Sequence, residues 1–169
     1  MTGDPLRSAL AELARRLQPA AIELIVGGGY GLLLRAEQLA RTGRAPRYGF
    51  TPKFRSTSDL DCFLGVEIIT DADKMKAIAT ALTELGYKPV EPYWTFERKV
   101  ADRDDSVHID LLAADVPENL AHLVRSRDGR RIRPKAFGEL HARKTREAVT
   151  VARDGERVDV SEDERASTS

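Results

Sequence analysis

Acidic side chains occupy alternate positions in an otherwise apolar stretch of the chain. Asp59 and Asp61 flank Leu60 in the run Asp-Leu-Asp-Cys-Phe-Leu. Side chains alternate across a β-strand, so both carboxylates would project from the same face of such a strand. Two like charges side by side repel each other, and a divalent cation placed between them offsets that cost. Mg²⁺ prefers carboxylate and phosphate oxygens as ligands. The pair therefore predicts a site for Mg²⁺ (or Mn²⁺) and a phosphate-bearing molecule.

A third carboxylate stands in a second apolar stretch. Asp110 lies within Val-His-Ile-Asp-Leu-Leu, residues 107–112. On a strand, His108 and Asp110 would share one face, and Val107, Ile109 and Leu111 would occupy the other. If this strand lies beside the strand of Asp59 and Asp61, the three carboxylates converge.

Each of these features also has a plain structural explanation. The Asp59 and Asp61 pair can be solvated at a sheet edge, and Asp110 can be a hydrogen-bonded structural group. His108 alone is more often a packing or hydrogen-bonding residue than a metal ligand. Cys62 is expected to be a small buried hydrophobe.

A run of three glycines is the next chemical feature. Gly27, Gly28 and Gly29 follow an apolar strand expected over residues 22–26 and precede a helix expected over residues 30–41. A helix N-terminus presents unpaired backbone amides to an anion, and a Cβ would block close approach of a phosphate. The run matches neither the P-loop, since no Gly-Lys-Ser/Thr follows, nor G-x-G-x-x-G, since position 32 is leucine.

Together these parts resemble the nucleotidyltransferase superfamily, whose fold is shared with DNA polymerase beta. The matching pattern is Val26-Gly27-Gly28 (or Gly28-Gly29), then Asp59-Leu60-Asp61, then Ile109-Asp110-Leu111. The Arg-x-Thr-x-Asp-Leu-Asp form of residues 55–61 is similar to the abortive-infection (AbiEii-type) nucleotidyltransferase toxins of type IV toxin–antitoxin systems. The resemblance covers residues 22–112 and thins out beyond them.

The resemblance implies transfer of a nucleoside monophosphate from a nucleoside triphosphate such as ATP to a hydroxyl acceptor. The acceptor stays open between a tRNA, a protein and a small molecule, and an antitoxin would be a partner of a toxin. Asp59 and Asp61 would hold Mg²⁺ or Mn²⁺, and Asp110 would complete the metal site and help to deprotonate the acceptor. The residues implied in nucleotide binding are Gly27, Gly28, Gly29, Arg55, Thr57 and Lys144.

Two other interpretations stand beside this one. The toxin relatives usually carry a further helical region with a lysine that holds the nucleotide, and Lys144 is a weak candidate for that lysine. The short C-terminal region therefore favours a non-catalytic member of the same fold that binds a nucleotide or a partner protein. The third interpretation is an unrelated α/β domain whose acidic strands are coincidental.

The elements that must position these residues follow from apolar periodicity and from capping residues. Asp4 and Pro5 begin a helix that ends near Gln18, and Asp71 caps another that ends at Gly86. The remaining expected elements are strands at 59–66, within 87–100 and at 107–113, turns at 102–105 and 127–130, a short helix at 118–124 and a hairpin of 149–151 with 157–160. The polar segment 139–147 is ambiguous, with a helix as one interpretation. This order predicts an α/β or α+β nucleotidyltransferase fold, a mixed sheet with helices mainly on one face.

Composition excludes several other classes. The chain has 169 residues, of which 41% are hydrophobic, which suits one domain over residues 1–160 and a disordered tail at 161–169. Lys plus Arg equals Asp plus Glu at 27 each, so any nucleic-acid contact must come from a local basic patch, at 44–55 or 125–135. The single cysteine excludes an intrachain disulfide. No signal-peptide pattern or membrane-length apolar run is present, so a cytoplasmic location without membrane contact is expected.

Overall fold

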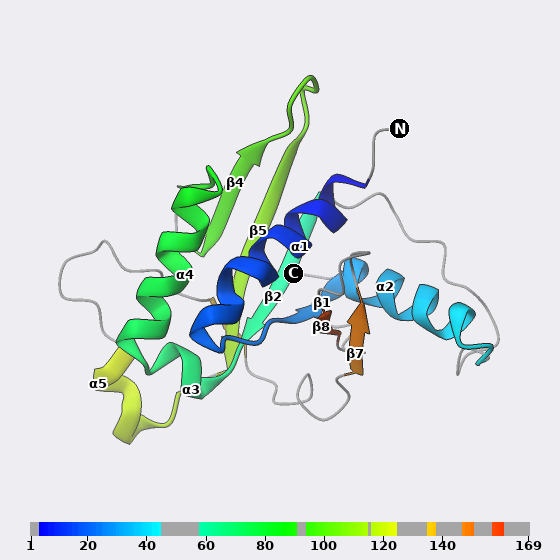
Figure 1. Cartoon of the computed structure of the whole chain (residues 1–169). Coiled ribbons are helices and arrows are strands. Elements are labelled where there is room, and N and C mark those ends of the chain that lie inside the picture. Colours follow the sequence, from blue (N-terminus) through cyan, green and yellow to red (C-terminus); the bar gives the residue numbers. More distant parts are fainter. Residues whose placement is uncertain are drawn as a thin grey trace.

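One mixed β-sheet carries the fold in the computed structural model (Figure 1). The structure describes residues 4–44, 58–90, 94–114, 116–124, 135–137, 147–150 and 157–160. Within them, the sheet has eight strands: the order is β3-β4-β5-β2-β1-β8-β7, and β6 pairs with β5 outside this order. The strands are β1 Ile25–Gly27, β2 Asp59–Leu64, β3 Lys88–Val90, β4 Thr95–Lys99, β5 Ser106–Ala114, β6 Lys135–Phe137, β7 Glu147–Thr150 and β8 Arg157–Val160. The predicted mixed sheet is confirmed.

Helices connect and cover the strands. They are α1 Pro5–Leu17, α2 Gly28–Arg41, α3 Val66–Ile69, α4 Ala72–Glu84 and α5 Ala121–Val124, with 3₁₀ turns η1 Gln18–Ala20 and η2 Glu118–Leu120. Among the described residues, no helix has the length and apolar character needed to cross a membrane.

The two long helices over the core begin where their capping residues predict. The carboxylate of Asp4 accepts a hydrogen bond from the backbone N–H of Leu6 (3.0 Å), and Pro5 is the first residue of α1. Asp71 likewise accepts from the backbone N–H groups of the first turn of α4. Gly86 follows α4 with a φ of 83°, a conformation that glycine adopts without strain. Both predicted helices are confirmed.

The hydrophobic core lies between one face of the sheet and the helices α1 and α4, which run across that face in Figure 1. Leu10 and Leu13 of α1 and Ile78 of α4 are fully buried. From the sheet, Leu60 and Ile109 are also fully buried. The helices thus cover one side of β2 and β5, and the predicted one-sided packing is confirmed for these strands.

The structure differs from the sequence prediction at several boundaries. The strand expected over 22–26 is shorter and later (β1), and α2 begins at Gly28, two residues before the expected start. The strand expected over 59–66 stops at Leu64, because α3 begins at Val66. The predicted segment 87–100 forms two antiparallel strands, β3 and β4, and β6 was not predicted.

The inward face of α2 is also not the expected one. The spacing of apolar residues in this helix predicts that the leucines and alanines at 32, 33, 36, 39 and 40 face the core. Instead Tyr30 and Leu34 are buried, the first four of those positions are half-buried, and Ala40 is exposed. Tyr30 and Leu34 are four residues apart and share one face of α2, and this face is the one that packs inward.

The C-terminal third is described only in short strands. The expected hairpin is confirmed, since β7 and β8 pair antiparallel, with Val149 opposite Val158. The short helix expected at 118–124 is present as η2 and α5. The predicted turn at 127–130, most of the ambiguous segment 139–147 and the predicted tail at 161–169 lie outside the described residues.

Candidate carboxylate site

Strand register places two of the predicted carboxylates directly side by side. β2 and β5 pair in parallel, with Asp61 opposite Asp110 and Asp59 opposite His108. On the other side of β2, Gly27 of β1 lies opposite Asp61. Neighbouring strands are about 4.8 Å apart, and residues paired in register project from the same face. Asp61 and Asp110 are therefore cross-strand neighbours. Asp59 lies on the same face of β2, two residues before Asp61.

The face opposite the helical core carries two rows of residues that cross the strands. β4 pairs antiparallel with β5, which places Thr95 opposite Asp110 and Glu97 opposite His108. The first row, here called the aspartate row, runs Gly27, Asp61, Asp110, Thr95. The second, the histidine row, runs Asp59, His108, Glu97.

Thr95 orients the carboxylate of Asp110. Its hydroxyl donates a hydrogen bond of 2.6 Å to Oδ1 of Asp110. A charge-assisted bond this short holds the carboxylate in one rotamer. Asp110 is half-buried, so this bond also offsets part of the cost of removing its charge from water.

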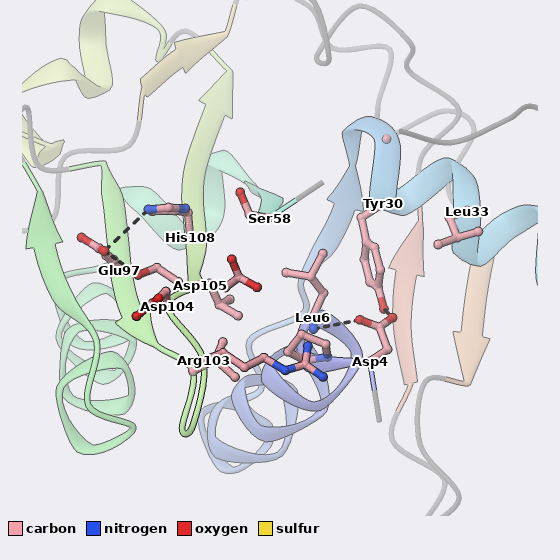
Figure 2. Close-up of a pocket in the computed structure, with 15 residues that line it drawn as sticks. Asp4, Leu6, Tyr30, Leu33, Ser58, Glu97, Arg103, Asp104, Asp105 and His108 are labelled. Atoms are coloured by element: carbon pink, nitrogen blue, oxygen red, sulfur yellow. Dashed lines mark hydrogen bonds and ion pairs between the residues drawn. The ribbon is translucent and has the colours of Figure 1, made fainter. Parts of the chain in front are cut away.

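The histidine row is a chain of polar contacts. Nδ1 of His108 lies 3.3 Å from Oδ1 of Asp59, and its Nε2 lies 4.0 Å from Oε1 of Glu97. Ser106 donates to Oε1 of Glu97 (2.7 Å), and Ser58 donates to Oδ1 of Asp59 (3.1 Å). Figure 2 shows His108 turned toward Glu97 across the strands.

The three glycines have three different surroundings. A Cβ on Gly27 would lie 2.2 Å from the ring of Phe63, so glycine is required there by packing. Gly28 has a φ of 61°, and a Cβ on it would lie 2.0 Å from Oδ2 of Asp61. A Cβ on Gly29 would meet nothing within 4 Å. Gly28 therefore lets the backbone of α2 lie against the Asp61 carboxylate, and open space begins at Gly29.

Cys62 lies behind the aspartate row, on the core face. Burial raises the pKa of its thiol, and the negative charges of Asp61 and Asp110 raise it further. A thiol held protonated in this way is not a nucleophile at neutral pH. The interpretation of Cys62 as a buried hydrophobe is confirmed.

The donor set fits a metal that is shared with a ligand better than one enclosed by protein. Within the described ranges, no group of three or more His, Cys, Asp and Glu side chains is arranged to hold a metal ion. The three carboxylates thus share a face without forming a ready three-ligand cage. Mg²⁺ is commonly held by one or two carboxylates together with substrate phosphates and water. The Asp61 and Asp110 pair meets that description, and a role in metal binding stays a prediction.

A pocket of about 870 Å³ adjoins the histidine row (Figure 2). His108, Glu97 and Ser58 belong to its wall, and Gly29 and Tyr30 line it from α2. Small-molecule sites commonly enclose from ~300 to ~1,000 Å³. The charged residues of the lining are Asp4, Glu97, Asp104, Asp105 and Arg103. Negative groups therefore outnumber the single positive one.

Several predicted site residues are not placed by the structure. Arg55, Thr57 and Lys144 lie outside the described residues, as do most of the basic residues at 44–55 and 125–135. Their predicted contacts with a nucleotide or a nucleic acid stay predictions.

Thr95 and Glu97 were missed by the sequence prediction. Their signal was the alternation Thr-Phe-Glu, in which Phe96 is buried, together with the predicted turn at 102–105. A hairpin closed by that turn pairs Lys99 with Ser106, and the same register places Thr95 opposite Asp110.

Comparisons with known proteins give one weak likeness. No protein-family profile and no curated protein matches the chain. A solved structure that matches is the crystal structure of ANT(2")-Ia in complex with adenylyl-2"-tobramycin. It is 13% identical, with a TM-score of 0.45 over 94% of this chain and 70% of that chain. A match at this level assigns no activity and no substrate to this chain.

Proposed function

We propose that the chain is a metal-dependent nucleotidyltransferase that moves a nucleoside monophosphate from a nucleoside triphosphate to a hydroxyl acceptor. The observation that carries the proposal is the pairing of Asp61 with Asp110 on neighbouring parallel strands, with the glycine turn of α2 against Asp61. Two adjacent carboxylates beside a helix N-terminus suit a cation and a polyphosphate bound together.

Asp61 and Asp110 would hold Mg²⁺ or Mn²⁺, with Asp59 as a further ligand. When bound, such a cation neutralises the triphosphate and the charge that develops on the attacking and leaving oxygens. Without it the two paired carboxylates would repel a triphosphate, so metal and nucleotide should bind cooperatively.

The N-terminus of α2 is the proposed triphosphate site. The first amides of a helix have no partner within the helix, and its dipole favours an anion. α2 has 14 residues, and its start at Gly28 lies beside Asp61. Gly29 opens onto space, which leaves room for phosphate oxygens. Arg55, Thr57 and Lys144 are kept as proposed nucleotide contacts on the family resemblance.

The chemical step is an in-line displacement. The acceptor oxygen bonds to the α-phosphorus while the bond from that phosphorus to the bridging oxygen of pyrophosphate breaks, and pyrophosphate leaves. The proton of the acceptor hydroxyl passes to a carboxylate. Asp110 is the proposed base, because the hydrogen bond from Thr95 fixes its orientation. Positioning of the reactants supplies much of the rate.

The pocket beside the histidine row is the proposed place of the acceptor. Its carboxylates, Asp104 and Asp105 among them, would repel the phosphates of an RNA backbone. Of the three acceptor classes, this charge supports a small molecule or a protein hydroxyl over a tRNA. A toxin role, and with it an antitoxin partner, rests on the resemblance of residues 55–61.

Thermal unfolding with each nucleoside triphosphate, with and without Mg²⁺, tests the proposal. The wild-type midpoint should rise with one triphosphate only when Mg²⁺ is present, since a ligand of the folded state stabilises it. Asp61→Asn should abolish the rise, and Glu118→Gln, an exposed carboxylate on η2, should retain it. An equal rise in Asp61→Asn would overturn the assigned site.

Pyrophosphate release separates the active enzyme from the alternative. The proposed enzyme releases pyrophosphate when acceptor pools of small molecules, proteins or tRNA are added. Nucleotide binding without release in any pool would favour a non-catalytic nucleotide-binding or partner-binding member of the same fold.

A further inference from the structure

Asp59 differs from the other two carboxylates in its exposure. Its side chain is 53% exposed, whereas Asp61 and Asp110 are half-buried within the aspartate row. Asp59 is also the first residue of β2, so the strand restrains it from one side only. An open side chain loses rotamer freedom when it binds a cation, unless a neighbour already holds it.

His108 is the neighbour that meets Asp59 from the adjacent strand. The two are paired in register, and Nδ1 of His108 lies 3.3 Å from Oδ1 of Asp59. Ser58 donates to the same oxygen. Because both contacts are made to Oδ1, they restrain the rotation of the carboxylate about its terminal bond.

The imidazole is itself held from its other side. Nε2 of His108 faces Glu97 at 4.0 Å, and Ser106 fixes Glu97 through a hydrogen bond. The order of contacts is therefore Ser106, Glu97, His108, Asp59, and it runs across three strands. In Figure 2 the side chains of Glu97 and His108 approach each other at the wall of the pocket.

We propose that His108 is a positioning residue of the carboxylate site. It restrains Asp59 on the same face as the Asp61 and Asp110 pair, so that Asp59 loses less rotamer freedom when it adds an oxygen to a divalent cation held by that pair. The role rests on the proposed function, since it requires a metal at the aspartate row. Outer hydrogen-bond partners of metal ligands commonly contribute from ~10-fold to ~100-fold in metal affinity.

Calorimetric titration with Mn²⁺ alone tests the role. His108→Ala should weaken Mn²⁺ binding by ~10-fold to ~100-fold. His108→Asn keeps an N–H donor of similar reach and should restore part of the loss. His122→Ala removes an exposed histidine on α5, away from the rows, and should bind Mn²⁺ like the wild type. Circular dichroism melting of each variant separates a loss of affinity from a loss of folding.

The outcomes separate this role from the proposed function. Mn²⁺ binding that is lost in Asp61→Asn but unchanged in His108→Ala would overturn the role of His108 and leave the proposed function standing. A fall in His108→Ala that His108→Asn does not relieve would also overturn it, because a donor to Asp59 would then not matter. No binding of Mn²⁺ alone by the wild type would overturn the role of His108. The proposed function is overturned only if Mg²⁺ and a nucleoside triphosphate together also leave the melting midpoint unchanged.

Discussion

Along β2, β4 and β5, successive residues face either the helical core or the carboxylate site. The core face carries Leu60, Cys62, Phe96, Ile109 and Leu111, all buried. Over the aspartate and histidine rows the opposite face carries Asp59, Asp61, Thr95, Glu97, His108 and Asp110, none of them fully buried. Farther along β2 and β5 the same face carries the buried apolar residues Phe63 and Leu112. The same backbone therefore presents two surfaces of opposite character, separated by the thickness of one sheet.

The contrast assigns different physical roles to residues that are neighbours in the chain. A core-face side chain stabilises the fold by leaving water. Adjacent carboxylates on the other face repel each other and weaken the metal-free fold, which is a common cost of a functional site. Substitution on one face should therefore change stability, and substitution on the other should change activity.

Asp110→Asn should give the largest effect on the carboxylate face. The amide keeps the shape of the side chain and can still accept from Thr95, but the charge is lost. We expect nucleotide transfer to fall by about 1,000-fold, the equivalent of several kcal/mol of transition-state stabilisation. Steady-state pyrophosphate release measures this fall.

The loss of activity in Asp110→Asn should not be accompanied by a loss of stability. Removal of one of two adjacent negative charges should leave the metal-free free energy of unfolding unchanged or higher. Urea denaturation in EDTA checks the sign. A loss of several kcal/mol would make Asp110 a structural group and would break the contrast between the faces.

Leu111→Ala is the matched change on the core face, one residue along the chain. Leu111 is fully buried, so its truncation should lower the free energy of unfolding by ~2 to ~5 kcal/mol. Urea denaturation measures the loss. Leu123→Ala, at an exposed leucine of α5, should cost less than ~1 kcal/mol. Equal costs at the two leucines would contradict the assigned core.

The two faces could be predicted from alternation alone, but their assembly could not. Apolar and polar residues alternate in 59–62 and 107–111, which fixes what shares a face with Asp61 and with Asp110. The pairing of β2 with β5 joins residues far apart in the chain, and such register is set by packing rather than by local pattern. The sequence therefore predicts that Asp61 and Asp110 lie side by side only if their strands are neighbours, and the structure shows that they are.

Local preference also failed where tertiary packing decides. The strand predicted over 59–66 includes the β-branched Val66, yet this residue begins α3, a helix that was not predicted. Ile68 and Ile69 are buried there, and this burial offsets the weak helix propensity of the segment. The caps of α1 and α4, by contrast, are local hydrogen bonds and were predicted correctly.

Gly28→Ala should disturb the aspartate row from the backbone side. Alanine at a φ of 61° is strained, and its Cβ would collide with Oδ2 of Asp61. We expect a loss of ~1 to ~3 kcal/mol in the free energy of unfolding and a fall in Mn²⁺ affinity as Asp61 moves. Denaturation and calorimetry measure the two effects.

Gly29→Ala is the control for Gly28→Ala. Its Cβ enters open space in the first turn of α2, so the fold should gain from a better helix former by less than ~1 kcal/mol. If nucleotide phosphates approach Gly29, the triphosphate should nevertheless bind more weakly. Equal stability losses at both glycines would refute the assigned contact of Gly28 with Asp61.

Tyr87→Phe should give the smallest effect, at a polar group within the hydrophobic core. Tyr87 is 4% exposed, and its hydroxyl has no hydrogen-bond partner among the described residues. The ring lies under the guanidinium of Arg98, 4.6 Å from the ring centroid, and phenylalanine keeps that contact. Removal of an unpaired buried hydroxyl should raise the free energy of unfolding by about 1 kcal/mol.

The pH dependence of Tyr87→Phe gives a second measurement of the same hydroxyl. Burial raises the pKa of Tyr87 from 10.0 to about 12, although the charge of Arg98 acts in the opposite direction. Below pH 10 both folded and unfolded forms keep the proton. Between pH 10 and 12 the unfolded chain releases it first, so wild-type stability should fall through this window and Tyr87→Phe should fall less.

Tyr30→Phe should change the free energy of unfolding in the opposite direction to Tyr87→Phe. The hydroxyl of Tyr30 donates to Oδ2 of Asp4 (2.5 Å), so its removal should lower the free energy of unfolding by about 1 kcal/mol. Denaturation of both variants at neutral pH compares a bonded and an unbonded buried hydroxyl in one protein. A loss in Tyr87→Phe as large as that in Tyr30→Phe would mean that Tyr87 is hydrogen-bonded. The core would then tolerate a polar group only where it is paired, as the carboxylate face pairs Asp110 with Thr95.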